Sequence, residues 1–132
     1  VLVASNVPEG LEIEALLHDA TEAYVSDLNT PLKHMLRAAQ CPSEYDRVEE
    51  LVYDAIVRRF FLPYEKSKEV KHHDLIALMT ERRDLMFNPH DLKWDASFDT
   101  YEKLAYKKTV VPMAPREAKR AFLDMFYKYY KE

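Results

Sequence analysis

Glycine, cysteine and long apolar runs are nearly absent from this sequence. One of its 132 residues is glycine, and barrels, sandwiches and glycine-rich nucleotide loops need several, at positive φ or at close backbone contacts. This scarcity predicts an all-α fold. Cys41 is the only cysteine, so no disulfide can form within the chain, which fits a reducing compartment. Because no apolar run reaches the length of a membrane span and no signal peptide is visible, we expect a cytoplasmic protein without a membrane partner.

The composition is that of a folded, mildly acidic domain. Hydrophobic residues make up 48% and charged residues 32% of the chain, and the formal net charge is −4. We therefore expect one globular domain over residues 1–132. General nucleic-acid binding is disfavoured, because it relies on Lys and Arg to neutralise many phosphates. A single nucleotide remains a suitable ligand, since a metal ion and two or three basic side chains can balance its phosphate.

Apolar spacing and breaker residues divide the chain into helices. Residues 88–114 are the least regular part. The helical segments expected are the end of an apolar helix at 1–6, a helix from 11 to about 25, a short helix from 31 to about 41, a helix from 43 to about 60, a long helix from 68 to about 86, and a last helix from 115.

A histidine and two acidic residues lie close to one another in the sequence near the start of the chain. If residues 15–22 are helical, Ala15, His18, Asp19 and Glu22 share one face, because they are spaced i, i+3, i+4 and i+7. Buried carboxylates cost several kcal/mol unless they are paired or bound to metal. Imidazole with carboxylate is a ligand set that suits a divalent transition metal. A purely structural His–Asp pair explains the spacing as well.

Two further aspartates could likewise have either a functional or a purely structural role. Asp74 lies on a largely apolar helix, one turn after Val70, where its carboxylate needs a partner. That partner is either a metal ion or a basic side chain. Asp27 follows the His–Asp segment directly and is followed by Lys33. It is either a functional residue or simply the cap of a turn.

Three segments carry a family resemblance. Residues 17–33, LHDATEAYVSDLNTPLK, resemble the central signature of HD-domain phosphohydrolases, in particular the branch with bacterial 5′-deoxynucleotidases and small phage-type hydrolases. Residues 70–75 followed by 81–86 look like the segment that supplies the distal aspartate of that family, and residues 112–118 are similar to the small members. The resemblance implies an HD-type helical bundle of about five to seven helices.

The same resemblance implies a ligand set. The family pattern is a histidine, then His-Asp, then a distant Asp on one metal, so His18, Asp19 and Asp74 take the last three roles. The metal would be Mn, Co, Fe, Ni or Zn, with Mg as a further option. No histidine precedes His18. We expect that the chain begins after the segment that carries the first ligand; the alternative is that this ligand has been lost.

The resemblance also suggests an activity. Glu22 would handle protons, Asp27 would orient the nucleophile or the sugar, and Lys33, Arg82 and Arg83 would contact phosphate, although a helix-surface role fits both arginines equally well. The expected function is a nucleotide phosphohydrolase, most simply a deoxynucleoside 5′-monophosphate phosphatase. The alternatives are a dNTP triphosphohydrolase and a non-catalytic nucleotide-binding protein. Base and sugar preference stay open.

The other histidines and the last helix have less specific expectations. His34 and His90 are expected at the surface, and His72 and His73 could line the pocket without binding the metal. Members of this branch often form homodimers. The aromatic residues of the last helix could supply an interface or pack the core of their own domain, and the second role is favoured for Phe122 and Phe126.

Overall fold

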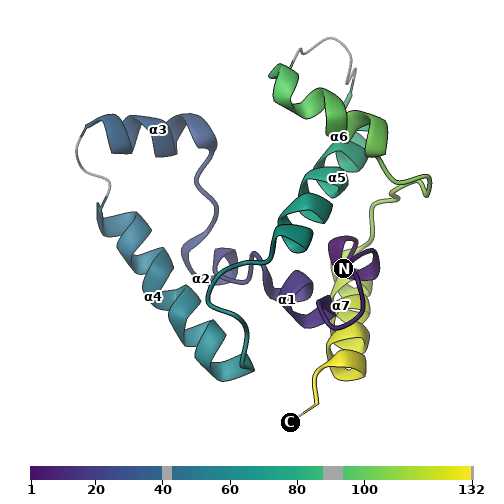
Figure 1. Ribbon diagram of the computed structural model, residues 1–132, viewed down its shortest axis with the longest axis horizontal. Coiled ribbons are helices and arrows are strands. Elements are labelled where there is room, and N and C mark those ends of the chain that lie inside the picture. Colours follow the sequence, from purple (N-terminus) through teal and green to yellow (C-terminus); the bar gives the residue numbers. More distant parts are fainter. Residues whose placement is uncertain (40–42, 88–93, 132) are drawn as a thin grey trace. The chain divides into compact units, whose positions relative to one another are not determined.

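The fold is described from a computed structural model of the chain, over residues 1–39, 43–87 and 94–131. Cys41 and His90 lie outside these residues. Every regular element in the described part is helical, which confirms the all-α fold (Figure 1). The elements are η1 (Val3–Ser5), α1 (Glu12–Leu17), α2 (Glu22–Val25), α3 (Thr30–Ala38), α4 (Ser43–Phe60), α5 (Lys68–Leu85), η2 (Ala96–Phe98), α6 (Asp99–Leu104) and α7 (Pro115–Tyr129).

The chain forms two compact units. The first consists of Val1–Leu16 and Lys66–Glu132, and the second consists of Leu17–Glu65. In the first unit α5 packs against α6 and against η1 (Figure 1). In the second unit α2 contacts α4. None of the described helices has the length and hydrophobicity needed to cross a membrane.

The core of the first unit joins residues from both ends of the chain. Val3 and Ala4 of η1, Ala15 and Leu16 of α1, and Val70 and Ala77 of α5 are buried in one cluster. Phe122 and Phe126 of α7 pack against this cluster and stack on each other with ring centroids 6.5 Å apart. The prediction that these two aromatic residues pack the core of their own domain is therefore confirmed.

Two side chains fix the start of α5. Ser67 is the N-cap of α5, and its hydroxyl accepts a hydrogen bond from the backbone N–H of Val70 at 3.3 Å. The backbone N–H of Ser67 donates in turn to Oε1 of Glu14 on α1, at 2.6 Å. Glu14 is buried, so its carboxylate joins α1 to the first turn of α5 within the first unit.

The predicted continuous helix from residue 11 to 25 is wrong. Helix α1 ends at Leu17, and α2 begins only at Glu22. Between them the N–H of Ala20 bonds to the carbonyl of Leu17, and the N–H of Glu22 bonds to the carbonyl of Asp19, both at 3.0 Å. These are i→i+3 bonds, which tighten the chain into a 3₁₀-like stretch. The face shared by residues 15, 18, 19 and 22 therefore does not exist as part of a regular helix.

The longer predicted helices agree with the structure. Those expected over 43–60, over 68–86 and from residue 115 correspond to α4, α5 and α7. The irregular region was only partly predicted, because it contains the short elements η2 and α6. Asp95 starts η2, since its carboxylate accepts a hydrogen bond from the N–H of Ser97 at 2.9 Å.

Candidate metal centre

The break between α1 and α2 holds the predicted His–Asp pair. Nε2 of His18 lies 2.9 Å from Oδ2 of Asp19, close enough for an ion pair when the imidazole is protonated. The His18 side chain is 15% exposed and that of Asp19 is 52% exposed. The imidazole is thus largely shielded, while the carboxylate next to it remains open to solvent.

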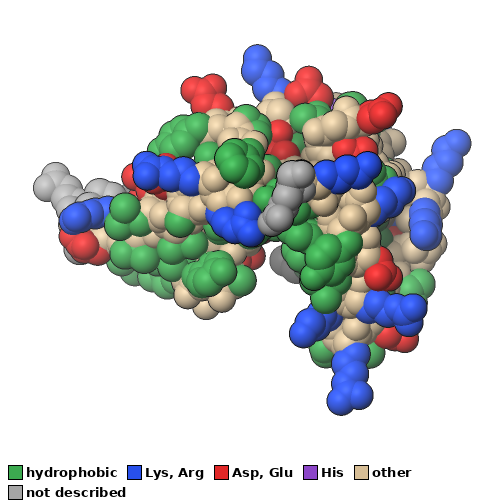
Figure 2. All heavy atoms as spheres, turned by 90° about the horizontal axis from the view of Figure 1, so that it is seen from below, with side chains coloured by type: hydrophobic (Ala, Val, Ile, Leu, Met, Phe, Trp, Pro, Cys, Tyr) green, Lys and Arg blue, Asp and Glu red, His purple; other side chains and the backbone are tan. Residues whose placement is uncertain are grey.

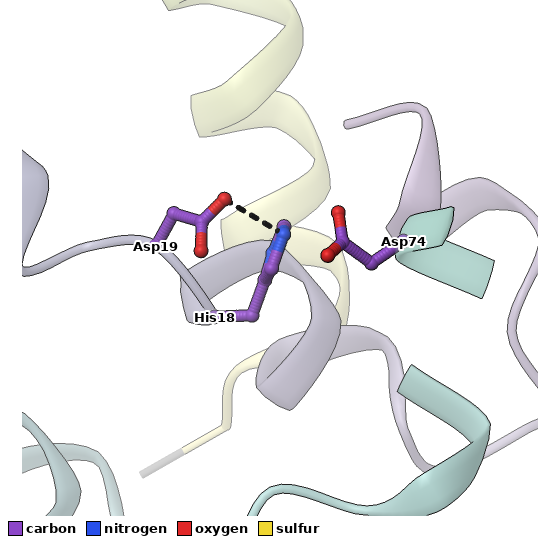
Figure 3. A group of neighbouring side chains, drawn as sticks. All are labelled: His18, Asp19 and Asp74. Atoms are coloured by element: carbon purple, nitrogen blue, oxygen red, sulfur yellow. Dashed lines mark ion pairs between the residues drawn. The ribbon is translucent and has the colours of Figure 1, made fainter. Parts of the chain in front are cut away.

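Asp74, the third metal ligand expected from the sequence, lies on α5 in the first unit (Figure 3). Asp74 is half-buried. The pKa of Glu81, two turns further along α5, is raised by burial in the first place and by the negative charge of Asp74 in the second.

Glu22 opens α2 in the midst of other carboxylates. The pKa of Glu22 is raised, first by the loss of surrounding water and then by the charges of Asp19 and Asp27. Lys33 and His18 oppose this shift without cancelling it. A carboxylate whose pKa is raised is a stronger proton acceptor than an ordinary glutamate.

Asp27 and Lys33 bind each other. Nζ of Lys33 lies 3.0 Å from Oδ1 of Asp27, and the hydrogen bond to Asp27 is the largest cause of the raised pKa of Lys33. Asp27 directly follows Ser26, whose carbonyl accepts a hydrogen bond from the Tyr45 hydroxyl at 2.5 Å, and Lys33 lies on α3. The structure thus brings together two predicted site residues, and a phosphate bound by Lys33 would compete with Asp27 for the ammonium group.

The two predicted phosphate-binding arginines have partners of different kinds. The guanidinium group of Arg82 lies over the ring of Trp94, 4.7 Å from its centroid. Arg83 donates two hydrogen bonds to the carboxylate of Asp84, at 2.6 and 2.8 Å, and a third to the carbonyl of Tyr106 at 2.8 Å. Arg83 therefore joins α5 to the segment after α6, which agrees better with the structural alternative than with phosphate binding.

Tyr106 was not identified from the sequence as part of this region. Its hydroxyl lies 2.8 Å from Nδ1 of His73, and the two rings are stacked. Burial, followed by the charge of Asp74, raises the pKa of Tyr106 to about 12. The pKa of His73 is lowered by burial and then by His72. His73 thus packs against a phenol rather than facing open solvent. Its neighbour His72 contacts the ring of Tyr101, and His34 is exposed as predicted.

Comparison with known proteins gives one informative relative. No family model matches the chain, and no solved structure matches it significantly. Among curated proteins the chain is similar to "Uncharacterized protein YfdR" of Escherichia coli (strain K12), with 40% identity over 130 residues. The match covers 96% of this chain and 66% of that protein, so the chain spans slightly less than two thirds of the relative. The name of the relative states no activity, ligand or partner.

Asp84 gives a prediction about pH and stability. Its pKa is lowered to about 2, first by the hydrogen bonds from Arg83 and then by the backbone N–H of Val110. Because the folded-state pKa lies below the ordinary value of 3.8, the ionised form stabilises the fold above about pH 4, and this contribution is lost as the pH falls toward 2. We expect Asp84→Asn to lower the free energy of unfolding at pH 7, and the difference from wild type to shrink between about pH 4 and pH 2.

Urea unfolding at a series of pH values measures this difference. Asp124→Asn is the matched control, because its carboxylate is 71% exposed and belongs to a surface pair with Arg120. A deficit in the Asp84 variant that stays constant down to pH 2 would contradict the assignment.

Proposed function

We propose that this chain is a metal-dependent phosphohydrolase that cleaves the phosphate ester of a deoxynucleoside 5′-monophosphate. The observation that carries the proposal is the His18–Asp19 pair at the α1–α2 break, with Glu22 beside it. The resemblance of residues 17–33 to the HD-domain signature supports a metal-binding role for this pair, with Asp74 as the third ligand that the resemblance implies. An HD-type bundle and a cytoplasmic location belong to the same proposal.

The side chains of the group suit a divalent cation. Typical metal–nitrogen and metal–oxygen bonds are about 2.0–2.2 Å, so two ligand atoms on one ion lie about 3 Å apart at right angles and about 4.2 Å apart on opposite sides. The 2.9 Å between His18 Nε2 and Asp19 Oδ2 fits the first geometry. One imidazole and two carboxylates accept Mn, Co, Fe, Ni or Zn.

Three protein ligands leave coordination positions for water and substrate, which is usual for catalytic metal sites. The bound cation would supply Lewis-acid activation of a phosphate oxygen and of a water molecule. His18, Asp19 and Asp74 would hold it, with two negative charges to balance its own. The first histidine of the family pattern has no counterpart among residues 1–17.

Glu22 is the proposed proton-handling residue. Its pKa is raised first by the loss of surrounding water and then by the charges of Asp19 and Asp27, all of which disfavour the ionised form. A carboxyl group in this state can take a proton from attacking water and deliver it to the leaving oxygen of the nucleoside. Asp27 would orient the nucleophile or the sugar while holding Lys33 in place.

Lys33 and Arg82 are the proposed phosphate contacts. The ammonium group of Lys33 carries a compact positive charge, so it can bind an incoming phosphate while it stays paired with Asp27. Stacking of Arg82 on Trp94 uses the flat face of the guanidinium group, whereas phosphate binding would use its edge. Arg83 is the weaker candidate, since Asp84 and Tyr106 engage its N–H groups.

Phosphate release from a panel of deoxynucleoside monophosphates tests the activity. The purified protein is loaded with Mn²⁺ or Co²⁺, its metal content is verified, and inorganic phosphate is measured. We expect release from at least one monophosphate. Release of triphosphate from dNTPs would instead select the triphosphohydrolase. Failure to hydrolyse either class, with metal bound, would remove the enzymatic proposal and leave a nucleotide-binding protein.

Asp74→Asn tests the ligand set. Replacing one carboxylate removes a charge and a strong donor, so we expect the affinity for Mn²⁺ to fall at least about tenfold. Titration with Mn²⁺, followed by electron paramagnetic resonance of the free ion, measures this. Asp124→Asn on α7 is the control with an equal change of charge at an exposed position. Equal Mn²⁺ affinity in both variants would show that Asp74 is not a ligand.

Glu22→Gln separates proton transfer from binding. The amide keeps the size of the side chain but cannot exchange a proton. We expect Mn²⁺ affinity close to wild type and a fall in kcat of about 10²–10⁴-fold, as is typical of a lost general acid or base. Turnover at the wild-type rate would exclude this role for Glu22.

A further inference from the structure

The backbone turns at Ser26 in a conformation that side chains rarely allow. Ser26 follows α2 directly and has a φ of 62° and a ψ of 165°. This region is populated almost solely by glycine, because a β-carbon there crowds the backbone. Residues held in such conformations are strained, and they are concentrated at functional sites. The next residue along the chain is Asp27, to which the proposed function gives the orientation of the nucleophile or the sugar.

A second positive φ in the same unit has an ordinary cause. Phe61 directly follows α4 and has a φ of 54°. The N–H of Leu62 bonds to the carbonyl of Val57 at 3.0 Å, which is the 6→1 bond of a Schellman motif. Termination of α4 thus accounts for Phe61. Ser26 differs, because its ψ of 165° is far from the value of about 47° that a left-handed helix end requires.

Hydrogen bonds hold the peptide groups on both sides of Ser26. The N–H of Ser26 donates to the carbonyl of Glu22 on α2, at 3.0 Å. The carbonyl of Ser26 accepts from the Tyr45 hydroxyl at 2.5 Å, which is short for a bond between two oxygens. Tyr45 lies in the first turn of α4 and is half-buried. The strained turn is therefore fixed by α2 on one side and by α4 on the other.

The turn places Asp27 against Lys33. Nζ of Lys33 lies 3.0 Å from Oδ1 of Asp27. Lys33 is itself placed by the start of α3, where Oδ1 of Asn29 accepts a hydrogen bond from the N–H of Leu32 at 3.0 Å. The N–H of Lys33 donates to the carbonyl of Asn29, also at 3.0 Å. The cap of α3 thus fixes one member of the ion pair, and the turn at Ser26 fixes the other.

Groups on α4 also act on this ion pair. The pKa of Lys33 is raised first by its hydrogen bond to Asp27 and then by the charges of Asp27 and Glu49, against the opposing effect of lost water. The pKa of Tyr45 is raised first by the loss of water and then by Glu49, so its hydroxyl stays protonated and able to donate. Figure 2 shows hydrophobic side chains gathered on the left, where Figure 1 has α3 and α4. The charged contacts of Lys33 are thus a local arrangement on a largely apolar face.

We propose that Tyr45 and Ser26 are positioning residues of the candidate site: the Tyr45 hydroxyl holds the strained turn at Ser26, and the turn holds Asp27 against Lys33. A substrate would then meet this pair already in place, which removes the cost of ordering it on binding. The expected effect on turnover rests on the proposed phosphohydrolase function. The expected effects on stability and on the conformation of residues 26–33 do not.

Glycine at the turn tests the strain. Ser26→Gly removes the crowding β-carbon, so we expect the melting temperature to rise by about 2–8 °C, even though glycine gives the unfolded chain more freedom. Ser26→Ala is the matched control, because it keeps the β-carbon, and no rise is expected. Scanning calorimetry measures both variants. Equal melting temperatures for the two would show that Ser26 is not strained.

Tyr45→Phe tests the hold on the turn, because it removes the hydroxyl and keeps the ring. We expect the backbone amide signals of Asp27 and Lys33 to shift in NMR spectra. The shift of the Lys33 signal should be smaller in the Ser26→Gly background, since glycine adopts the turn without the hydrogen bond. Tyr64→Phe is the control, at a residue of the same unit that is 64% exposed. Unmoved signals of Asp27 and Lys33 in Tyr45→Phe would overturn the proposal.

Turnover tests whether the held turn serves the reaction. We expect Tyr45→Phe to lower kcat at least about tenfold and to leave the affinity for Mn²⁺ unchanged, because Asp27 moves while the proposed metal ligands stay. Adding Ser26→Gly should restore part of kcat, which a role limited to the stability of α4 does not explain. A wild-type kcat in Tyr45→Phe would contradict the positioning role. A wild-type chain without any hydrolytic activity would instead refute the phosphohydrolase function, and the calorimetry and NMR results would still decide whether Tyr45 and Ser26 hold Asp27.

Discussion

Negative charge concentrated at the break between α1 and α2 is the constraint on which the candidate site depends. Asp19, Glu22 and Asp27 lie within nine residues of one another, and the pKa of Glu22 is raised first by burial and then by the charges of the two aspartates. His18 and Lys33 offset part of this charge through their pairs with Asp19 and Asp27. A bound cation would offset more of it, as the proposed metal site requires.

Two sets of residues on helix α5 make different structural contacts. Val70, Ile76, Ala77 and Met79 are buried and hold it in the first unit. Thr80, Arg83 and Asp84 hold the segment after α6, because they bind the backbone of Tyr106 and Val110. The phenol of Tyr106 then reaches back to His73, next to Asp74. The position of Tyr106 against His73 is therefore tied to contacts made up to eleven residues further along the same helix.

Local features of the chain were predictable from sequence, and distant contacts were not. The 3.6-residue periodicity of apolar residues predicts α4, α5 and α7, and a serine before a helical run predicts the Ser67 cap. The break at residues 18–21 escaped prediction because Leu16, Leu17, Ala20 and Tyr24 keep a helical spacing across it, while only the backbone hydrogen bonds change. The Arg83–Tyr106 and Glu14–Ser67 contacts join residues far apart in sequence, so no local pattern reveals them.

The missed break changes how the candidate site would work. In a continuous helix His18 and Asp19 would be held rigidly, and their ligand atoms could approach a cation only if the whole helix moved. A short stretch of i→i+3 bonds is held by fewer and weaker contacts than an 18-residue helix with five buried residues such as α5. The His–Asp pair is thus the adjustable part of the proposed ligand set. Any adjustment of the pair to a bound cation would therefore change the turn between α1 and α2, which also positions Glu22.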